Sequence, residues 1–125
     1  MRQAKIKVSE AATLRGQFRR SKYGAIRTVV DNITFDSKAE ARRYGELKWM
    51  EKVGDVSEII VHPHFSISVN GILICMVELD FQYLAKDKRT FEDVKGRDNA
   101  LSRLKRKLVE AQYGIKVKLI RYGRG

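Results

Sequence analysis

Residues 76–95, MVELDFQYLAKDKRTFEDVK, carry the pattern that decides the fold of this chain. Every second residue from Val77 to Tyr83 is apolar, which is typical of a strand with one buried face. A second β-rich run covers residues 90–95, and the polar residues between the two runs favour a chain reversal at Asp87-Lys88. The stretch therefore predicts two neighbouring antiparallel strands with Asp80 on the first and Asp93 on the second.

The residues before this stretch extend the predicted sheet. Segments 56–62, 65–69 and 72–84 are rich in β-formers, and Asn70-Gly71 is a strong tight-turn signal. The economical arrangement is a mostly antiparallel meander, in which residues 72–84 form one continuous strand.

Two helices are predicted on either side of these strands. Asp36-Ser37 precedes a run of helix formers over residues 38–53 that stops before Gly54. The second helix follows Gly96 and closes at Gly114, and its core-facing stripe is predicted to be Leu101, Leu104, Leu108 and Ala111. Residues 115–122 then form a last strand, which can return beside the central strands through a helical crossover. This order predicts an α/β (α+β) fold with a mixed central sheet of four to five strands flanked by two helices.

The N-terminal part differs in composition from the rest. Residues 26–35 show a hairpin pattern around the turn residues Asp31-Asn32. Residues 1–24 are strongly basic with few apolar positions, so we expect a flexible basic arm followed by one domain over residues 25–125. The arm's candidate DNA-binding residues are Arg15, Arg19, Arg20 and Lys22.

Charge narrows the class of partner. The chain has 26 Lys and Arg against 15 Asp and Glu, a formal net charge of +11, which attracts polyanions at long range. Nucleic acid is the first partner to consider. No segment reaches the roughly 18 apolar residues of a membrane-spanning helix, and Cys75 has no second cysteine to bond. We expect a soluble, cytoplasmic protein without a membrane partner.

Three acidic residues are the candidate catalytic groups. Asp80 and Asp93 can face one point from adjacent strands, and two such carboxylates suit Mg²⁺ or Mn²⁺. The alternatives are simple half-buried alternation for Asp80 and an exposed, solubilising strand for Asp93. Glu40 shares a helical stripe with Tyr44 and Leu47, but Ser37-x-x-Glu40 is also a capping box that would hold its side chain at the helix start.

Other polar residues have two interpretations each. Lys95 is either a surface lysine or a group that orients the attacking water. His62 and His64 flank Pro63 and are either ordinary strand-end residues or ligands for a metal or phosphate. The second helix region is predicted to point a positive side outward, as a phosphate contact or as a solvated face. Its basic residues are Arg97, Arg103, Lys105, Arg106 and Lys107.

The order of acids on helix, strand and strand resembles the PD-(D/E)xK nuclease superfamily over roughly residues 33–121. Three blocks are similar to a family of small phage proteins assigned to that superfamily and to the phage endonuclease I family of Holliday-junction resolvases. These blocks are ITFDSKAEARRY (33–44), EDVKG (92–96) and KRKLVEAQYGI (105–115). The chain departs from the superfamily pattern at Leu79, where proline is expected, and at Asp93, where glutamate is commoner.

The resemblance implies a restriction-endonuclease-like core and a Mg²⁺-dependent endodeoxyribonuclease, with Mn²⁺ able to substitute. It implies that Asp80, Asp93 and the Val94 carbonyl bind the metal, that Glu40 holds a water or a second ion, and that Lys95 orients the nucleophile. Branched or junction DNA, cut by a homodimer without an organic cofactor, is the substrate this implies. The alternatives are a non-catalytic DNA-binding recombination or regulatory protein and a nuclease subunit of a larger phage complex.

Overall fold

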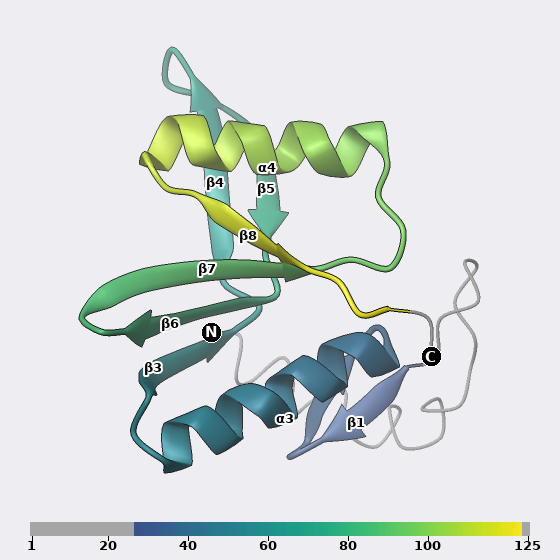
Figure 1. The fold of residues 1–125 in the computed structure, drawn as a ribbon. Helices are drawn as coiled ribbons and strands as arrows, with labels where there is room; N and C mark the ends of the chain where they lie inside the picture. Colours follow the sequence, from purple (N-terminus) through teal and green to yellow (C-terminus); the bar gives the residue numbers. More distant parts are fainter. Residues whose placement is uncertain (1–26, 124–125) are drawn as a thin grey trace. The chain divides into compact units, whose positions relative to one another are not determined.

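The computed structural model describes residues 27–123, and these residues form two helices and eight strands (Figure 1). The mixed α+β class and the mixed multi-stranded sheet agree with the sequence prediction. Contacts divide the chain into two units, and the boundary between Glu46 and Leu47 falls inside a helix. The predicted arm of residues 1–24 lies outside the described residues, and the single domain over 25–125 stays a prediction. Neither of the described helices has the length and apolar character that crossing a membrane requires.

The first unit contains the predicted N-terminal hairpin. Strands β1 (Thr28–Val30) and β2 (Ile33–Phe35) pair antiparallel around Asp31 and Asn32. Both turn residues have positive φ, 52° and 63°, as a two-residue type I′ turn requires. The Tyr44 hydroxyl donates to Asp31 Oδ2 at 2.8 Å, and its ring lies 5.2 Å from that of Phe35.

Helix α3 (Lys38–Lys52) begins where the sequence predicts and ends one residue earlier than predicted. The backbone N–H of Glu40 donates to Ser37 Oγ at 3.1 Å, which satisfies one of the free N–H groups of the first turn. At the other end Gly54 has φ 89° and donates to the Glu51 carbonyl, while Asp55 donates to Met50. This pair of hydrogen bonds is the glycine-dependent helix stop known as a Schellman motif.

The second unit is built on a four-stranded mixed sheet with the order β3-β6-β7-β8. Strands β3 (Val56–Val61), β6 (Phe81–Ala85) and β7 (Lys88–Val94) are antiparallel neighbours. Strand β8 (Val117–Ile120) lies parallel to β7 after the α4 crossover, as predicted. The β6–β7 turn is formed by Lys86 and Asp87, one residue earlier than expected.

The predicted meander is wrong at one point, because two of its strands leave the sheet. Strands β4 (His64–Val69) and β5 (Ile72–Glu78) form a separate hairpin around Asn70-Gly71. The expected continuous strand 72–84 breaks at Leu79-Asp80. Pro63 lies opposite this break; proline has no N–H for a ladder, and His62 before it has a positive φ of 58°.

The two halves of this broken hairpin remain hydrogen bonded to each other. His62 N donates to the Asp80 carbonyl at 2.9 Å, and Leu79 N donates to the Pro63 carbonyl at 3.0 Å. The chain therefore forms one long hairpin with a kink in both arms, and β4 and β5 run in a different direction from β3 and β6 (Figure 1).

Helix α4 (Ala100–Tyr113) packs against the β4–β5 hairpin. Asn99 caps its start by accepting from Ser102 N at 2.8 Å, and Gly114 ends it with φ 67°. The Tyr113 ring contacts Phe65 at 5.2 Å. A buried cluster lies beneath the helix and consists of Ile67, Val77, Leu79, Phe91 and Val109.

The predicted buried stripe of this second helix is right for Leu108, which packs against the core cluster, and wrong for the exposed Leu101, Leu104 and Ala111. Leu101 and Leu104 are 59% and 53% exposed, whereas Val109 is fully buried and Arg106 is 8% exposed. The helix is rotated because Val109 enters the core cluster and Arg106 reaches acidic partners below the helix. Those partners are tertiary neighbours, which helical periodicity alone does not reveal.

Candidate metal centre

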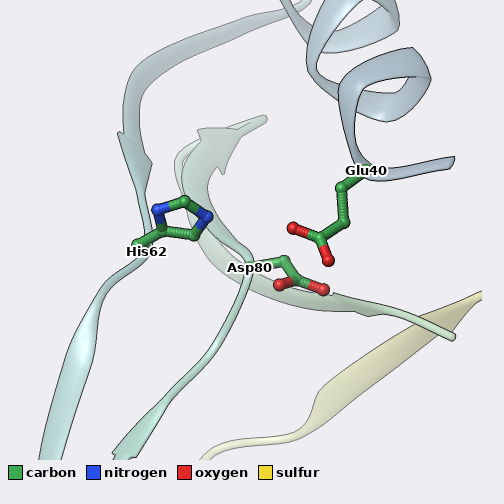
Figure 2. A group of neighbouring side chains, drawn as sticks. All are labelled: Glu40, His62 and Asp80. Atoms are coloured by element: carbon green, nitrogen blue, oxygen red, sulfur yellow. The ribbon is translucent and has the colours of Figure 1, made fainter. Parts of the chain in front are cut away.

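The kink in the long hairpin brings His62 and Asp80 together. His62 follows β3 and Asp80 precedes β6, and the two backbones are joined by the hydrogen bond from His62 N to Asp80 O. A ring nitrogen of His62 and a carboxylate oxygen of Asp80 lie within 4.8 Å of one another. Figure 2 shows these two side chains and also draws Glu40 of α3. Both are half-buried, so a small ion can reach them.

The Asp80 carboxylate is held from the neighbouring strand. Its Oδ2 accepts a hydrogen bond from Val94 N at 2.7 Å, and its own backbone N–H donates to the Glu92 carbonyl. Both contacts come from β7, the strand of Asp93, so Asp80 lies beside that strand, although it precedes β6 and is not part of it. A carboxylate oriented by a backbone N–H keeps lone pairs for a cation.

Asp93 has cationic neighbours just after β7 and on α4. Its Oδ2 lies 3.5 Å from Lys95 Nζ and 3.8 Å from Arg106 Nη1, and the Asp93 side chain is 8% exposed. The predicted proximity of Asp93 and Lys95 is therefore present. Asp93 is not among the described residues whose ligand atoms cluster with those of His62 and Asp80, so its predicted part in metal binding stays a prediction.

Arg106 joins the loop before α4 to this acidic strand. Its guanidinium donates two hydrogen bonds to Asp98, at 2.6 and 3.1 Å. The hydrogen bond from Arg106 lowers the pKa of the Asp98 carboxyl from its ordinary value of 3.8. The same hydrogen bond, with the charges of Asp98 and Asp93, raises the pKa of Arg106. This buried pair fixes the loop between β7 and α4.

Arg106 is therefore a correction to the predicted outward basic face. It is buried with Asp98 and Asp93, because a bidentate Arg–carboxylate pair in a partly buried place needs both partners close. The other predicted basic residues of this region keep their side chains accessible: Arg97, Arg103 and Lys107 are exposed, and Lys105 is half-buried. The predicted arm residues Arg15, Arg19, Arg20 and Lys22 lie outside the described part of the chain.

Glu40 lies in the first turn of α3 and is 9% exposed. The serine half of the predicted capping box is present, because Ser37 Oγ accepts from Glu40 N. Burial of a carboxylate is costly unless a partner compensates for it. Both predicted roles of Glu40, as a cap and as a site residue, remain compatible with this position.

Two polar residues, His62 and Glu92, have surroundings in the structure that the sequence pattern did not predict. The histidine pair around Pro63 splits: His62 faces Asp80, whereas His64 Nε2 lies 3.1 Å from Glu78. Pro63 is the sequence feature that could have predicted this difference, because it marks the kink where the strand is interrupted. Glu92 is completely buried and accepts a hydrogen bond from the Tyr83 hydroxyl. Alternation placed Glu92 opposite Asp93 but did not show that it is buried.

A histidine beside a carboxylate is a donor set that fits a divalent cation. Carboxylate oxygens suit Mg²⁺ and Mn²⁺, and an imidazole nitrogen suits transition metals. Mn²⁺ accepts both kinds of donor. The two side chains leave most coordination positions to water or substrate, as catalytic sites require.

The fold and this cluster define a basic α+β protein with a histidine–carboxylate pair at a kinked hairpin. A family model matches residues 20–123, and the chain belongs to that family, described as Protein of unknown function (DUF1064). No curated protein and no solved structure shows a significant match to the chain.

Proposed function

We propose that this protein is a metal-dependent DNA endonuclease that hydrolyses phosphodiester bonds, selective for junction or branched DNA, in phage recombination or DNA processing. The observation that carries the proposal is the meeting of His62 and Asp80 at the kink, beside β7, which carries Asp93 and is followed by Lys95. Asp80, Asp93 and Lys95 match the PD-(D/E)xK resemblance, and His62 is a candidate ligand that the resemblance does not include. The protein would act in the cytoplasm of the host cell.

In this proposal His62 and Asp80 hold the cation, and Glu40 has the role that the resemblance implies, holding a water or a second ion. Two observations support this role for Glu40: its side chain is buried at the start of α3, and the resemblance assigns it to the site. A divalent cation at the site would supply positive charge that stabilises the phosphate as it gains charge. Asp93 completes the acidic set that the resemblance implies.

In this proposal Lys95 acts on the attacking water and on the phosphate. Its ammonium group lies next to Asp93 and is 23% exposed, so it is positioned by a carboxylate and still reaches solvent. There it orients the attacking water and offsets charge on the phosphate. Attack by water forms a new P–O bond while the bond to the leaving sugar oxygen breaks.

DNA is held through its phosphates by the exposed cations of the second unit, Arg97, Arg103 and Lys107. Backbone contacts position a duplex without reading its bases, and they favour selection by shape. Symmetric cutting of a junction needs two active sites, which a two-fold dimer provides.

The decisive experiment compares the full chain with an Asp80→Asn variant on labelled four-way junction, fork and duplex DNA, with Mg²⁺, Mn²⁺ or EDTA. Asn keeps the shape of Asp80 and can still face Val94 N, but it removes the charge that binds the cation. We expect metal-dependent cutting, strongest on the junction, and a loss of at least about 100-fold in rate for Asp80→Asn. Junction binding measured in EDTA stays unchanged.

Matched controls separate the site from general effects. Asp87→Asn makes the same chemical change in the exposed β6–β7 turn and keeps full activity. Glu40→Gln abolishes cutting, while Ser37→Ala, which removes the helix cap, lowers stability by about 1 kcal/mol but leaves cutting intact. If the chain and Asp80→Asn bind DNA equally and neither cuts with any metal, the protein is a DNA-binding factor and the nuclease proposal is wrong.

A further inference from the structure

The β4–β5 hairpin has one protected edge and one open edge. On the β4 side, the Gln112 side chain takes the place of a neighbouring strand, because it accepts from Ser68 N at 3.0 Å and donates to Ser66 O at 2.9 Å. Within residues 27–123, β5 pairs only with β4. The outer backbone edge of β5, from Ile72 to Glu78, is therefore open to another strand.

This open strand also carries large exposed apolar side chains. Ile72, Leu73, Ile74 and Met76 are 66%, 60%, 57% and 52% exposed. Only Cys75 and Val77 of this strand face the core cluster. Natural proteins usually protect such an edge with charges, proline or a covering element. β5 contains no lysine, arginine or proline, and its single charged residue, Glu78, lies at its end. Its register with β4 shifts between Ile67 and Ser68, so Ile74 has no partner on β4.

The distribution of lysine and arginine along the chain favours a second copy of this chain as the partner of β5. None of the 26 Lys and Arg residues lies between Val53 and Ala85, although the whole chain has a net charge of +11. This segment has no cation to hold a DNA phosphate. Two copies of a strongly basic chain repel one another elsewhere, and they can approach at lowest electrostatic cost through this segment.

We propose that β5 is the surface through which two copies of this chain associate, by antiparallel pairing of β5 with β5 of the second copy. Two identical strands that pair antiparallel are related by a two-fold axis, so both copies use the same surface. Overlap along Ile72–Glu78 is greatest when Cys75, the midpoint, lies on the two-fold axis. Ile74 of each copy then lies opposite the Met76 position of the other.

The expected strength is modest. Seven residues of strand cover less than the 20–30 residues per side of a standard interface, so dissociation in the micromolar range is expected. The inference does not depend on the nuclease proposal, because its readout is the mass of the particle.

The test measures the mass of the full chain by sedimentation equilibrium over a concentration series. We expect the unmodified chain to dimerise and Ile74→Glu to stay monomeric, because the dimer would bring two new carboxylates into the β5–β5 contact. Leu101→Glu is the matched control, since Leu101 is equally exposed but lies on α4; it keeps the dimer. Met76→Lys serves as a second interface variant if Ile74→Glu melts or has an altered circular dichroism spectrum.

Oxidation of the single cysteine tests the register. Directly opposed residues of antiparallel strands have Cα atoms about 4.5–5.5 Å apart, which is within the range a disulfide can span. A Cys75-linked dimer that forms in the unmodified chain and is absent in Ile74→Glu supports the proposed pairing. A monomer at all concentrations, or a dimer that both interface variants leave intact, overturns the proposal; a dimer without the Cys75 cross-link overturns the centred register.

Discussion

His62 shows how the conformation of one residue places a candidate metal ligand beside Asp80. Its φ of 58° is uncommon for a residue with a side chain, and Pro63 after it interrupts the ladder. The hydrogen bond from His62 N to the Asp80 carbonyl maintains this conformation. The imidazole is thereby placed beside the Asp80 carboxylate instead of continuing the strand face.

At this residue the proposal predicts a change in metal preference. His62→Ala removes a nitrogen ligand that suits Mn²⁺ better than Mg²⁺. We expect Mn²⁺ affinity, measured by isothermal titration calorimetry without DNA, to fall about tenfold or more. His64→Ala is the control, because His64 pairs with Glu78. Equal Mn²⁺ affinity in both variants would remove His62 from the site.

The loop and helix from Lys95 to Tyr113 depend on one buried ion pair. Asp98 accepts two hydrogen bonds from Arg106, which also lies 3.8 Å from Asp93. A buried arginine on a helix is retained when its charge is matched. The pair explains why α4 turns Arg106 inward and leaves Leu101 and Leu104 exposed.

This element gives a pH prediction. The pKa of Asp98 is lowered in the folded state by the Arg106 hydrogen bond. Its stabilising contribution is therefore fully present above the unfolded value of 3.8 and is lost as the pH falls through the lower folded pKa. Asp98→Asn should lower the melting temperature at pH 7 and reduce its decline between about pH 5 and 2.

Calorimetric melting curves over this pH range provide the measurement. Asp55→Asn, at an exposed position after α3, is the matched substitution and should follow the unmodified chain. If Asp98→Asn retains the full acid dependence, the Asp98–Arg106 pair contributes no pH-dependent stability.

Over the whole molecule, charge is divided along the chain. All basic residues lie before Val53 or after Ala85, and the segment between them contains the β4–β5 hairpin and the His62–Asp80 pair. Phosphate contacts and association between copies are thus assigned to different segments. The candidate ligands His62 and Asp80 lie in the segment without lysine or arginine, whereas Glu40 lies before it.

This distribution predicts the salt dependence of DNA binding. Each phosphate contact contributes a slope of about −0.9 in log K against log salt. Replacing Arg103 and Lys107 by Gln should make the slope shallower by about 1.8. The control is the pair Lys86→Gln and Lys88→Gln, which removes the same charge at the start of β7, away from the end that leads to α4. Fluorescence anisotropy in EDTA should show little change for this control pair; equal slopes for both pairs would mean that α4 makes no specific phosphate contacts.

The turns, the helix ends and the central strands could be predicted from local sequence, because they depend on the dihedral preferences and the apolar spacing of neighbouring residues. Asp31-Asn32 and Asn70-Gly71 form the predicted turns since these residues accept positive φ, and Gly54 and Gly114 end the helices for the same reason. Alternation along residues 76–95 located the central strands. The adjacency of Asp80 to β7 also followed from a short reversal between two apolar strands.

Only the tertiary structure decided which groups meet. Local pattern placed Leu101 and Leu104 inward, but the buried contacts of Val109 and Arg106 rotated the helix the other way. Likewise the kink at His62 requires hydrogen bonds between His62 and Asp80 and between Pro63 and Leu79, partners that are distant in the chain and that no local period encodes. Sequence determines turns and periods through each residue's own dihedral preferences, whereas partners distant in the chain settle helix rotation, strand breaks and the composition of the site.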